Sequence, residues 1–364
     1  MKPFLAIDTL VLLFAAGALG KQQHIAITPS ASASSASSSS SSNSPFPQSS
    51  PVWLSNVQPM PGNVKAYPSD VSKIPTGPLS KDIKSQALKG YPPPSKLPPT
   101  NSPEVQAVIK AIDWSKVPNT PPRKTRSDGY VITQGYDESD PDCWWSVSRC
   151  VKPKYPGLPE DVVYCPKVGD WGLVSMTVFL YALMTFDDGP ATPEERETGV
   201  EPELYNFLAK HQQKADLFYI GSNVFNAPAA AQRALADGHT LCSHTWSHPV
   251  MTAQSNEVVV AELYWSLRVI KETTGVTTRC WRPPYGDVDD RVRAIAWQMG
   301  LRTILFDDAN FDWDLPGGPG SGKLPTSFVD GLFEKWIQSL NNGTDQHGHI
   351  ILESILRILH VLAN

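Results

Sequence analysis

Predicted strands and helices alternate between residues 201 and 306, and this pattern constrains the fold more than any other feature. Alternation of this kind is typical of a parallel sheet with helices packed outside it. The polar motifs follow predicted strands, as they do when a site lies at the carboxyl ends of barrel strands. We therefore expect an α/β fold. The predicted helices are Glu201–Gln212, Ala229–Asp237, Ser255–Thr273 and Asp290–Met299, and the predicted strands are Ala215–Ile220 and Arg302–Phe306.

Two adjacent carboxylates, Asp187 and Asp188, stand where an apolar run meets the turn Gly189-Pro190. Neighbouring side chains of a regular strand point to opposite faces, so we expect the turn to aim both carboxylates into one cavity. Carboxylates this close repel each other unless a positive charge separates their roles. A metal ion does so if one aspartate is its ligand and the other stays a base. Taken alone, such a pair is more often a solvated strand-end turn.

Two histidines follow in the stretch Ser243-His244-Thr245-Trp246-Ser247-His248. Their spacing of four predicts a helical turn that places both rings on one face. With Asp188 they form a three-ligand set that leaves positions open for water and substrate, which is typical of hydrolytic zinc sites. Further on, Arg282 in Arg-Pro-Pro-Tyr-Gly offers a guanidinium that can pair with a carboxylate in a fixed geometry. Each of these two motifs alone is weak evidence.

Taken together and in this order, TFDDGP, SHTWSH and RPPYG resemble the motifs of the polysaccharide deacetylase family (carbohydrate esterase family 4), and of its fungal chitin deacetylases in particular. The resemblance runs from about Asp142 to Leu352. It implies a distorted, incomplete (β/α) barrel, NodB-homology-like, with an open groove for a polymer. It also implies that Asp188, His244 and His248 hold Zn²⁺ or another divalent metal such as Co²⁺.

The resemblance implies roles for three further residues of these motifs. Asp187 would be the general base, Arg282 would orient it and keep it ionised, and the backbone N–H of Tyr285 would help to hold the oxyanion. Trp313 would line the sugar groove.

An aspartate near Trp313 would, in relatives, orient a catalytic histidine. Asp308 and Asp312 are the candidates for the groove. Which of Asp307, Asp308 and Asp312 matches the family position stays open, because the local spacing differs from the usual form.

The last predicted strand departs from the family pattern. Relatives end the barrel with Gly-x-Ile-x-Leu-x-His, whose histidine is the catalytic acid. Gly348–Glu353 matches that strand, but Ser354 stands at the histidine position. A serine hydroxyl cannot protonate an amine leaving group near neutral pH, whereas imidazolium can. His349 lies too early in the strand to reach the site, and His360 lies six residues beyond Ser354. We interpret this terminus as truncated or altered; a paralogue that has lost activity is the alternative.

A second departure is the run of eleven mostly apolar residues from Val174 to Met184. In relatives, Leu173 would be followed almost at once by Thr185. The run extends the strand, forms a buried insertion, or is translated from an intron retained in the gene model.

The N-terminal third has the composition of an exported chain. Residues 1–20 resemble a secretory signal peptide, because a short apolar run follows Lys2 and ends in small residues. Residues 21–126 form a Ser/Pro-rich stalk and linker, with a serine tract that we expect to be disordered. One helix, Ser102–Trp114, is predicted there and could dock on the main domain. The deacetylase domain then covers 127–364.

In an exported chain, the five cysteines indicate disulfides, and the odd number leaves at least one outside an internal pair. A bridge between Cys242 and Cys280 would tie the histidine loop to the arginine loop, although spacing alone does not assign the partners. Asn342 lies in an Asn-Gly-Thr sequence and is a candidate glycosylation site. The net charge of −5 gives no electrostatic footprint for nucleic acid.

These features predict a secreted, cell-wall-associated hydrolase that removes acetyl groups from chitin or chitin oligomers. Two alternatives stay open. A homologue without turnover would bind chitin in the wall, as Ser354 suggests. An active enzyme would otherwise act on another acetylated polysaccharide, such as xylan or peptidoglycan.

Overall fold

The structure, a computed structural model, describes residues 51–54, 57, 88–166, 184–190, 200–211, 213–316 and 322–354. The predicted signal peptide and serine tract lie outside these residues. So do residues 174–183 of the apolar run, and so does His360.

Seven strands form the central sheet in the order β6-β5-β4-β3-β2-β9-β7, and every neighbouring pair is parallel. A smaller sheet pairs β1 with β8 in antiparallel fashion. The strands are β1 Tyr164–Cys165, β2 Met184–Gly189, β3 Ala215–Tyr219, β4 Thr240–Ser243, β5 Cys280–Trp281, β6 Arg302–Thr303, β7 Asp308–Ala309, β8 Gly348–His349 and β9 Ile351–Ser354.

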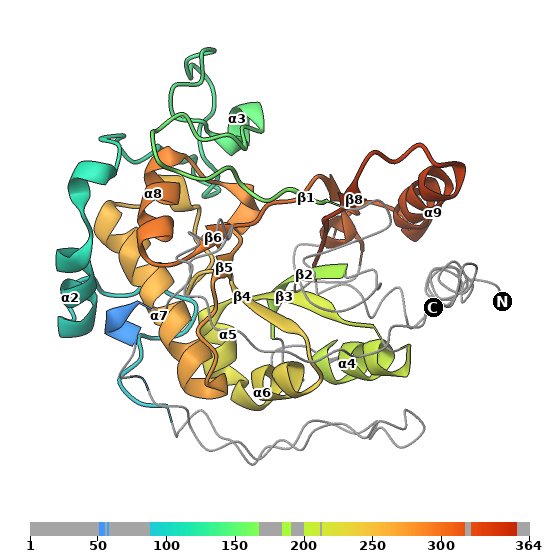
Figure 1. Cartoon of the computed structure of the whole chain (residues 1–364), viewed down its shortest axis with the longest axis horizontal. Coiled ribbons are helices and arrows are strands. Elements are labelled where there is room, and N and C mark those ends of the chain that lie inside the picture. The colour runs from blue at the N-terminus through green and yellow to red at the C-terminus, as the bar shows by residue number, and fades with distance from the viewer. Residues whose placement is uncertain are drawn as a thin grey trace, which may run out of the picture.

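The connection between β6 and β7 shows that the central sheet curls. The two strands are opposite edges of the sheet, yet only residues 304–307 separate them. Five residue steps span at most about 18 Å. In a flat sheet, seven strands spaced about 4.8 Å apart would place the edges about 29 Å from each other. The edges are therefore drawn together, and the predicted distorted, incomplete barrel is confirmed (Figure 1). The predicted strand Arg302–Phe306 is shorter than expected because the chain leaves the sheet after Thr303 to make this crossing.

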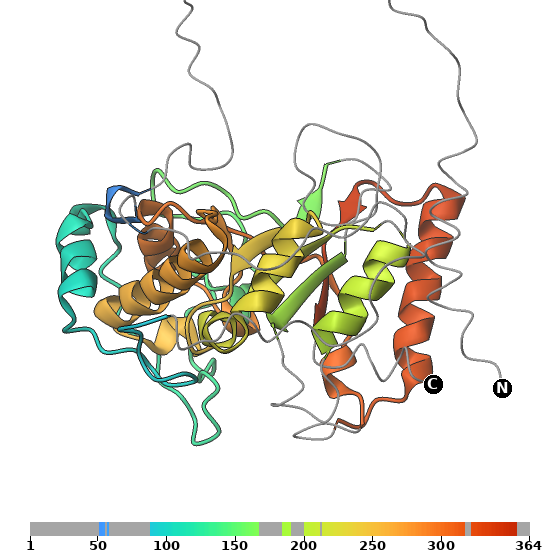
Figure 2. The same cartoon turned by 90° about the horizontal axis from the view of Figure 1, so that it is seen from below.

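Helices follow most strands and lie outside the sheet (Figures 1 and 2). The longest, α7, begins and ends as its sequence predicts: Ser255 accepts a hydrogen bond from the Val258 N–H, and Gly275 ends the helix with a φ of 81°. The sequence analysis did not predict α5 or α9. The principal helices are α2 Pro103–Ala111, α3 Trp145–Ser148, α4 Val200–Lys210, α5 Gly221–Asn226, α6 Pro228–Ala236, α7 Asn256–Thr274, α8 Asp290–Gln298 and α9 Thr326–Asn342.

Short 3₁₀ helices complete the described elements. They are η1 Val52–Leu54, η4 Trp114–Lys116, η5 Met251–Ala253, η6 Pro284–Gly286 and η7 Asp312–Asp314. Among the described residues, no helix is both long enough and apolar enough to span a membrane.

Residues 88–117 pack on the domain, which corrects their assignment to a linker. Helix α2 has the predicted cap, with Ser102 accepting from the Val105 N–H, and it packs against α7. Tyr91 stacks on Trp246 and donates a hydrogen bond to Glu272. The side chains of this segment that are buried in the main core are Leu88, Val105, Val108, Ile112 and Val117.

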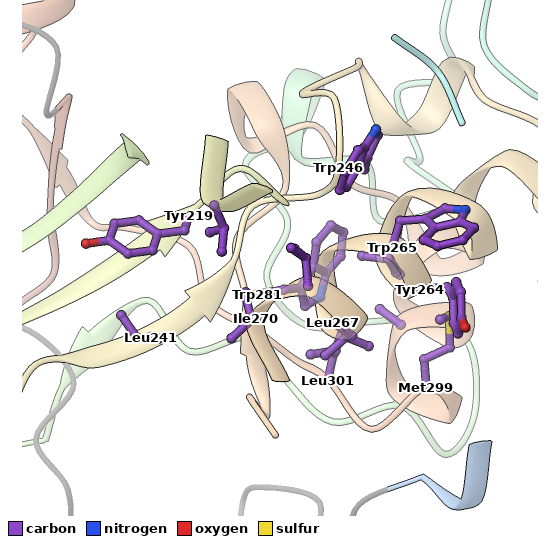
Figure 3. Packing of buried hydrophobic residues seen from close by; sticks show 14 of the residues in the cluster. Tyr219, Leu241, Trp246, Tyr264, Trp265, Leu267, Ile270, Trp281, Met299 and Leu301 are labelled. Atoms are coloured by element: carbon purple, nitrogen blue, oxygen red, sulfur yellow. The ribbon is translucent and has the colours of Figure 1, made fainter. Parts of the chain in front are cut away.

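The main core lies between the sheet and helices α7 and α8, and it is rich in aromatic side chains (Figure 3). Trp246, Trp265 and Trp281 are almost fully buried there. Since Trp246 belongs to the histidine loop and Trp281 immediately precedes Arg282, the core anchors both motifs.

Two disulfides are present, Cys143–Cys150 and Cys242–Cys280. The second joins β4 to β5, as the position of these cysteines beside the two motifs suggested. Cys165 is buried and takes part in neither disulfide.

Candidate metal centre

Asp187 and Asp188 diverge because of an irregularity in β2. The pairing register of β2 with β3 shifts between Asp187 and Gly189, and Asp188 has a φ of 71°. A bulge re-aims side chains in this way, and aspartate is among the residues that tolerate a left-handed backbone. Both carboxylates therefore reach the same region, as expected, but through a bulge within the strand and not through the turn after it.

The histidine loop is not helical, which corrects the predicted helical turn. His244 follows β4 directly, and residues 244–248 form an irregular loop in which Thr245 and His248 have φ values of 66° and 61°. The two imidazole rings nevertheless lie 4.8 Å apart between centroids. The left-handed backbone at Thr245 and His248 thus brings the two rings as close together as a helical turn would have done.

Buried Glu262 of α7 holds this loop in place. Its carboxylate accepts hydrogen bonds from the N–H of Trp246 at 2.8 Å and the N–H of Ser247 at 2.9 Å. The hydroxyl of Ser247 donates a third, at 2.6 Å. Glu262 was not predicted from the sequence, because α7 contains other charged residues, such as Glu257 and Glu272, and nothing singles this one out.

The side chains of Asp188, His244 and His248 converge. Oδ1 of Asp188 lies 3.1 Å from Nε2 of His248 and 3.6 Å from Nε2 of His244. One ligand atom from each residue lies within 4.8 Å of the others. The structure therefore brings together the three predicted ligands.

These donors fit a zinc-like ion in chemistry as well as in distance. Nδ1 of His244 lies 2.7 Å from the carbonyl oxygen of Arg282, so that nitrogen carries the proton and Nε2 presents its lone pair toward Asp188. The side chain of Asn223, at the start of α5, donates to the Asp188 carbonyl and fixes the bulge. Two imidazoles and a carboxylate form the open ligand set of a catalytic zinc site.

Arg282 is fully buried and holds Asp187 in place. Its Nη1 lies 2.7 Å from Oδ1 of Asp187 and 3.0 Å from the Thr185 hydroxyl, and its Nη2 donates to the Leu305 carbonyl. The guanidinium also lies 3.9 Å from the centroid of the Phe218 ring. The predicted pairing of Arg282 with Asp187 is confirmed.

The electrostatic environments of the two aspartates are opposite. Burial raises the pKa of Asp187 to about 6, although the Arg282 guanidinium acts against the rise. Burial also acts to raise the pKa of Asp188, but the charge of His248 and the hydrogen bond from His248 hold it well below its usual range. Burial lowers the pKa of His244 to about 3, so its ring is neutral at ordinary pH. Asp188 and His244 are thus in the forms that bind metal, and Asp187 is poised as a base.

Ser354 lies in this centre, at the carboxyl end of β9. Its hydroxyl donates to Oδ2 of Asp188 at 3.0 Å, and its N–H lies 3.0 Å from both carboxylate oxygens of Asp312. Burial raises the pKa of Asp312 to about 8. Of the three aspartates left open by the sequence, Asp312 is therefore the one beside this strand end.

Asp307 and Asp308 lie at the other end of the sheet, which corrects the assignment of Asp308 to the groove. Asp308 pairs with Ile351 at the start of β9, and its Oδ2 lies 3.6 Å from Nδ1 of His349. His349 is thus remote from Ser354, as expected.

Exposed aromatic side chains flank the centre. The half-exposed ring of Tyr285 lies 4.7 Å from His248 and edge-on to Tyr130, at 5.5 Å. On the side of Asp312, Trp313 is 52% exposed and neighbours exposed Phe311 at 6.4 Å. Tyr130 and Phe311 were missed by sequence reasoning because neither lies in a recognisable motif.

A family model described as polysaccharide deacetylase matches residues 180–304, a range that contains the aspartates, both histidines and Arg282. The chain carries a polysaccharide deacetylase domain. Its curated relatives include "Chitin deacetylase" of Amylomyces rouxii, which is 39% identical over 254 residues, 69% of this chain and 55% of that protein. "Chitin deacetylase 2" of Cryptococcus neoformans is 40% identical over 259 residues, 70% of this chain and 52% of that protein.

The chain thus spans about half the length of these two relatives. Among solved structures, the chitin deacetylase of Colletotrichum lindemuthianum aligns with a TM-score of 0.44 and 19% identity, covering 57% of this chain and 83% of that one.

Proposed function

We propose that this domain hydrolyses the N-acetyl groups of chitin or chitin oligomers, giving chitosan and acetate. The observation that carries the proposal is the convergence of Asp188, His244 and His248 beside a separately held Asp187. Chitin as the substrate is supported by the names of relatives that are 39–40% identical to this chain.

Asp188, His244 and His248 would hold the metal, which we propose to be zinc; cobalt suits the same donors. When bound, such an ion polarises a carbonyl and lowers the pKa of bound water. Asp188 contributes negative charge, and the Ser354 hydroxyl occupies its second oxygen. That hydrogen bond leaves Oδ1 to face the two imidazoles.

Asp187 would accept the proton of the attacking water. A base works best when its pKa lies near the operating pH, and a value of about 6 meets that condition. Arg282 fixes one carboxylate oxygen at 2.7 Å and leaves Oδ2, which lies 3.9 Å from His244, on the metal side. The N–H of Tyr285 would donate to the developing oxyanion.

The exposed aromatic residues would form the walls of the sugar groove. Tyr285 and Tyr130 lie on the His248 side, and Trp313 and Phe311 lie on the Asp312 side. Flat rings of this kind give large contact areas at low entropic cost. Secretion and a place in the cell wall, supported by the N-terminal sequence, are part of the same proposal, as is glycosylation of Asn342, an exposed residue at the end of α9.

Delivery of a proton to the leaving amine is the step for which the described centre lacks a free imidazole; Asp312, whose pKa burial raises to about 8, is protonated near neutral pH, but both of its oxygens face the Ser354 N–H. The Ser354 hydroxyl remains protonated near neutral pH and cannot serve as an acid. The other described histidines make contacts elsewhere: His211 with Phe207, His239 with the Ala215 N–H, and His347 and His349 with Asp307. We therefore expect the chain as given to turn over slowly.

Ser354→His tests this expectation. Asp312 lies where it can orient an imidazole at this position, so acetate release from chitin oligomers should rise by about 10²-fold or more, the usual contribution of a general acid. Ser354→Ala is the matched control: it removes the same hydroxyl, and with it the hydrogen bond to Asp188, without adding an acid, so its turnover should not rise above that of the parent. Zinc content and melting temperature should be measured for all three proteins.

Comparable turnover by the parent and by Ser354→His, with zinc bound in both, would contradict the proposed need for an acid here. If both bind chitin oligomers and neither releases acetate, the chain is a binding homologue.

A further inference from the structure

A second group of metal-binding side chains lies at the other end of the sheet. Asp307 immediately precedes β7, and His347 and His349 lie at β8, just before β9. One ligand atom from each of these three residues lies within 4.8 Å of the others. The catalytic centre, in contrast, contains Ser354 at the carboxyl end of β9.

The fold holds each of the three residues in place. The ring of His347 stacks on that of Tyr164 from β1, with centroids 4.4 Å apart, and β1 pairs with β8 at Tyr164 and His349. Oδ1 of Asp307 accepts a hydrogen bond from the Ile350 N–H at 2.7 Å, which directs Oδ2 toward the histidines. The positions therefore do not depend on an ion.

The distances suit a tetrahedral ion. Oδ2 of Asp307 lies 2.7 Å from Nδ1 of His349 and 3.8 Å from Nδ1 of His347. Nδ1 of His347 also lies 2.9 Å from the carbonyl oxygen of Gly348, a contact that it would give up on binding an ion. Ligand bonds of about 2.0–2.1 Å give ligand–ligand separations of about 3.3 Å in a tetrahedron. Small side-chain movements would thus admit an ion.

Two further carboxylates, those of Asp345 and Asp308, lie close to the three residues. Nε2 of His349 lies 3.6 Å from Oδ1 of Asp345, whose side chain is only 7% exposed. Oδ2 of Asp345 is buried with no hydrogen-bond partner among the described residues. A carboxylate on the far nitrogen of a ligating histidine is the usual outer contact of a metal site. With Asp308 at 3.6 Å from His349, three carboxylates face two imidazoles, and a cation would balance this excess of negative charge.

We propose that Asp307, His347 and His349 bind a second divalent metal ion, zinc, at the end of the sheet away from the catalytic centre. The ion would join the start of β7 to β8 and so fasten the small β1–β8 sheet to the edge of the barrel. Without it, the same atoms form a histidine–aspartate hydrogen bond, and that bond raises the pKa of His349. Metal binding replaces the proton of that bond.

Zinc titration of the full metal-free chain, without an affinity tag, tests the proposal. The parent should bind two equivalents by calorimetry and by metal analysis. His347→Ala should bind one, His244→Ala should bind one, and the double variant none. Gln346→Ala is the matched control, because it changes an exposed neighbour and should retain two. In His244→Ala, zinc should raise the melting temperature, and adding His347→Ala should abolish the rise.

One equivalent in the parent that is retained in His347→Ala and lost in His244→Ala, or two in His347→Ala, would overturn the proposal; in the latter case the second ion is adventitious. If His347→Ala does not fold, His347→Gln replaces it: this variant should also bind one equivalent of zinc, and it loses less side-chain packing. Because the His244→Ala background removes a ligand of the first site, failure at the second site does not bear on the proposed deacetylation.

Discussion

At the scale of single residues, the adjacent Asp187 and Asp188 have different partners, and their pKa values are shifted in opposite directions. From the sequence, one aspartate was assigned as a metal ligand and the other as the base, because two carboxylates this close repel each other unless a positive charge separates their roles. The sequence could not predict the bulge that separates them, since the bulge depends on how β2 pairs with β3. Similarly, the spacing of His244 and His248 predicted their proximity, but the helix was wrong because the buried Glu262 determines the loop.

Asn substitutions at the two aspartates should separate their roles. Asp188→Asn removes a charged ligand and should lose the one equivalent of zinc bound with His244 and His248. Asp187→Asn should retain zinc, yet in the Ser354→His background it should reduce turnover by about 10²–10⁴, the contribution of a general base. It should also lower the melting temperature, because Arg282 loses its buried counter-charge. Equal loss of zinc in both variants, measured by metal analysis, would show that the roles are shared.

At the scale of elements, α7 links the core to the metal centre. One face of the helix packs in the core through side chains such as Trp265, while Glu262 reaches the loop that contains His248. Burial raises the pKa of Glu262 to about 7, against the three hydrogen bonds that favour its ionised form. Nothing in the sequence of α7 singles out Glu262 for this contact.

Glu262→Gln should weaken both the fold and the metal centre. The amide oxygen can accept from both N–H groups and the NH₂ group can donate to the Ser247 hydroxyl, but the hydrogen bonds lose their charge assistance, and the cost should be about 1 kcal/mol of unfolding free energy. His248 should then be less well placed, so zinc affinity at the Asp188 site should fall. Glu257→Gln makes the same change on an exposed turn of the same helix and should affect neither quantity. A loss of stability with unchanged zinc affinity in Glu262→Gln would show that Glu262 does not position His248.

At the scale of the whole molecule, the alternation within residues 201–306 was enough to predict a parallel sheet with helices outside it, because its strands and helices follow one another locally; the incomplete barrel was predicted from the resemblance to the family. Residues 88–126 were assigned to a linker, with one helix that could dock on the domain. The prolines of residues 88–126 resemble those of a linker, but Tyr91 and the apolar face of α2 pack on α7, which lies far away in the sequence. Such long-range contacts have no local signal. Helix α9 was missed although Val329, Phe333 and Trp336 lie on one face and are buried in a separate cluster.

The packed N-terminal segment should be required for stability. A chain that begins at residue 51 should melt near the parent, whereas one that begins at 127 should melt lower by about 10 °C or more. The second chain loses the buried side chains of 88–117, each contributing about 1.5–3 kcal/mol before entropy is counted.

In the full chain, Val108→Asp should reproduce much of the loss, while Lys110→Asp, two residues along the same helix but exposed, should not. Equal melting temperatures for the chains beginning at 51 and at 127 would restore the linker interpretation. Because α7 also holds the histidine loop through Glu262, the loss should appear in zinc affinity as well as in melting temperature.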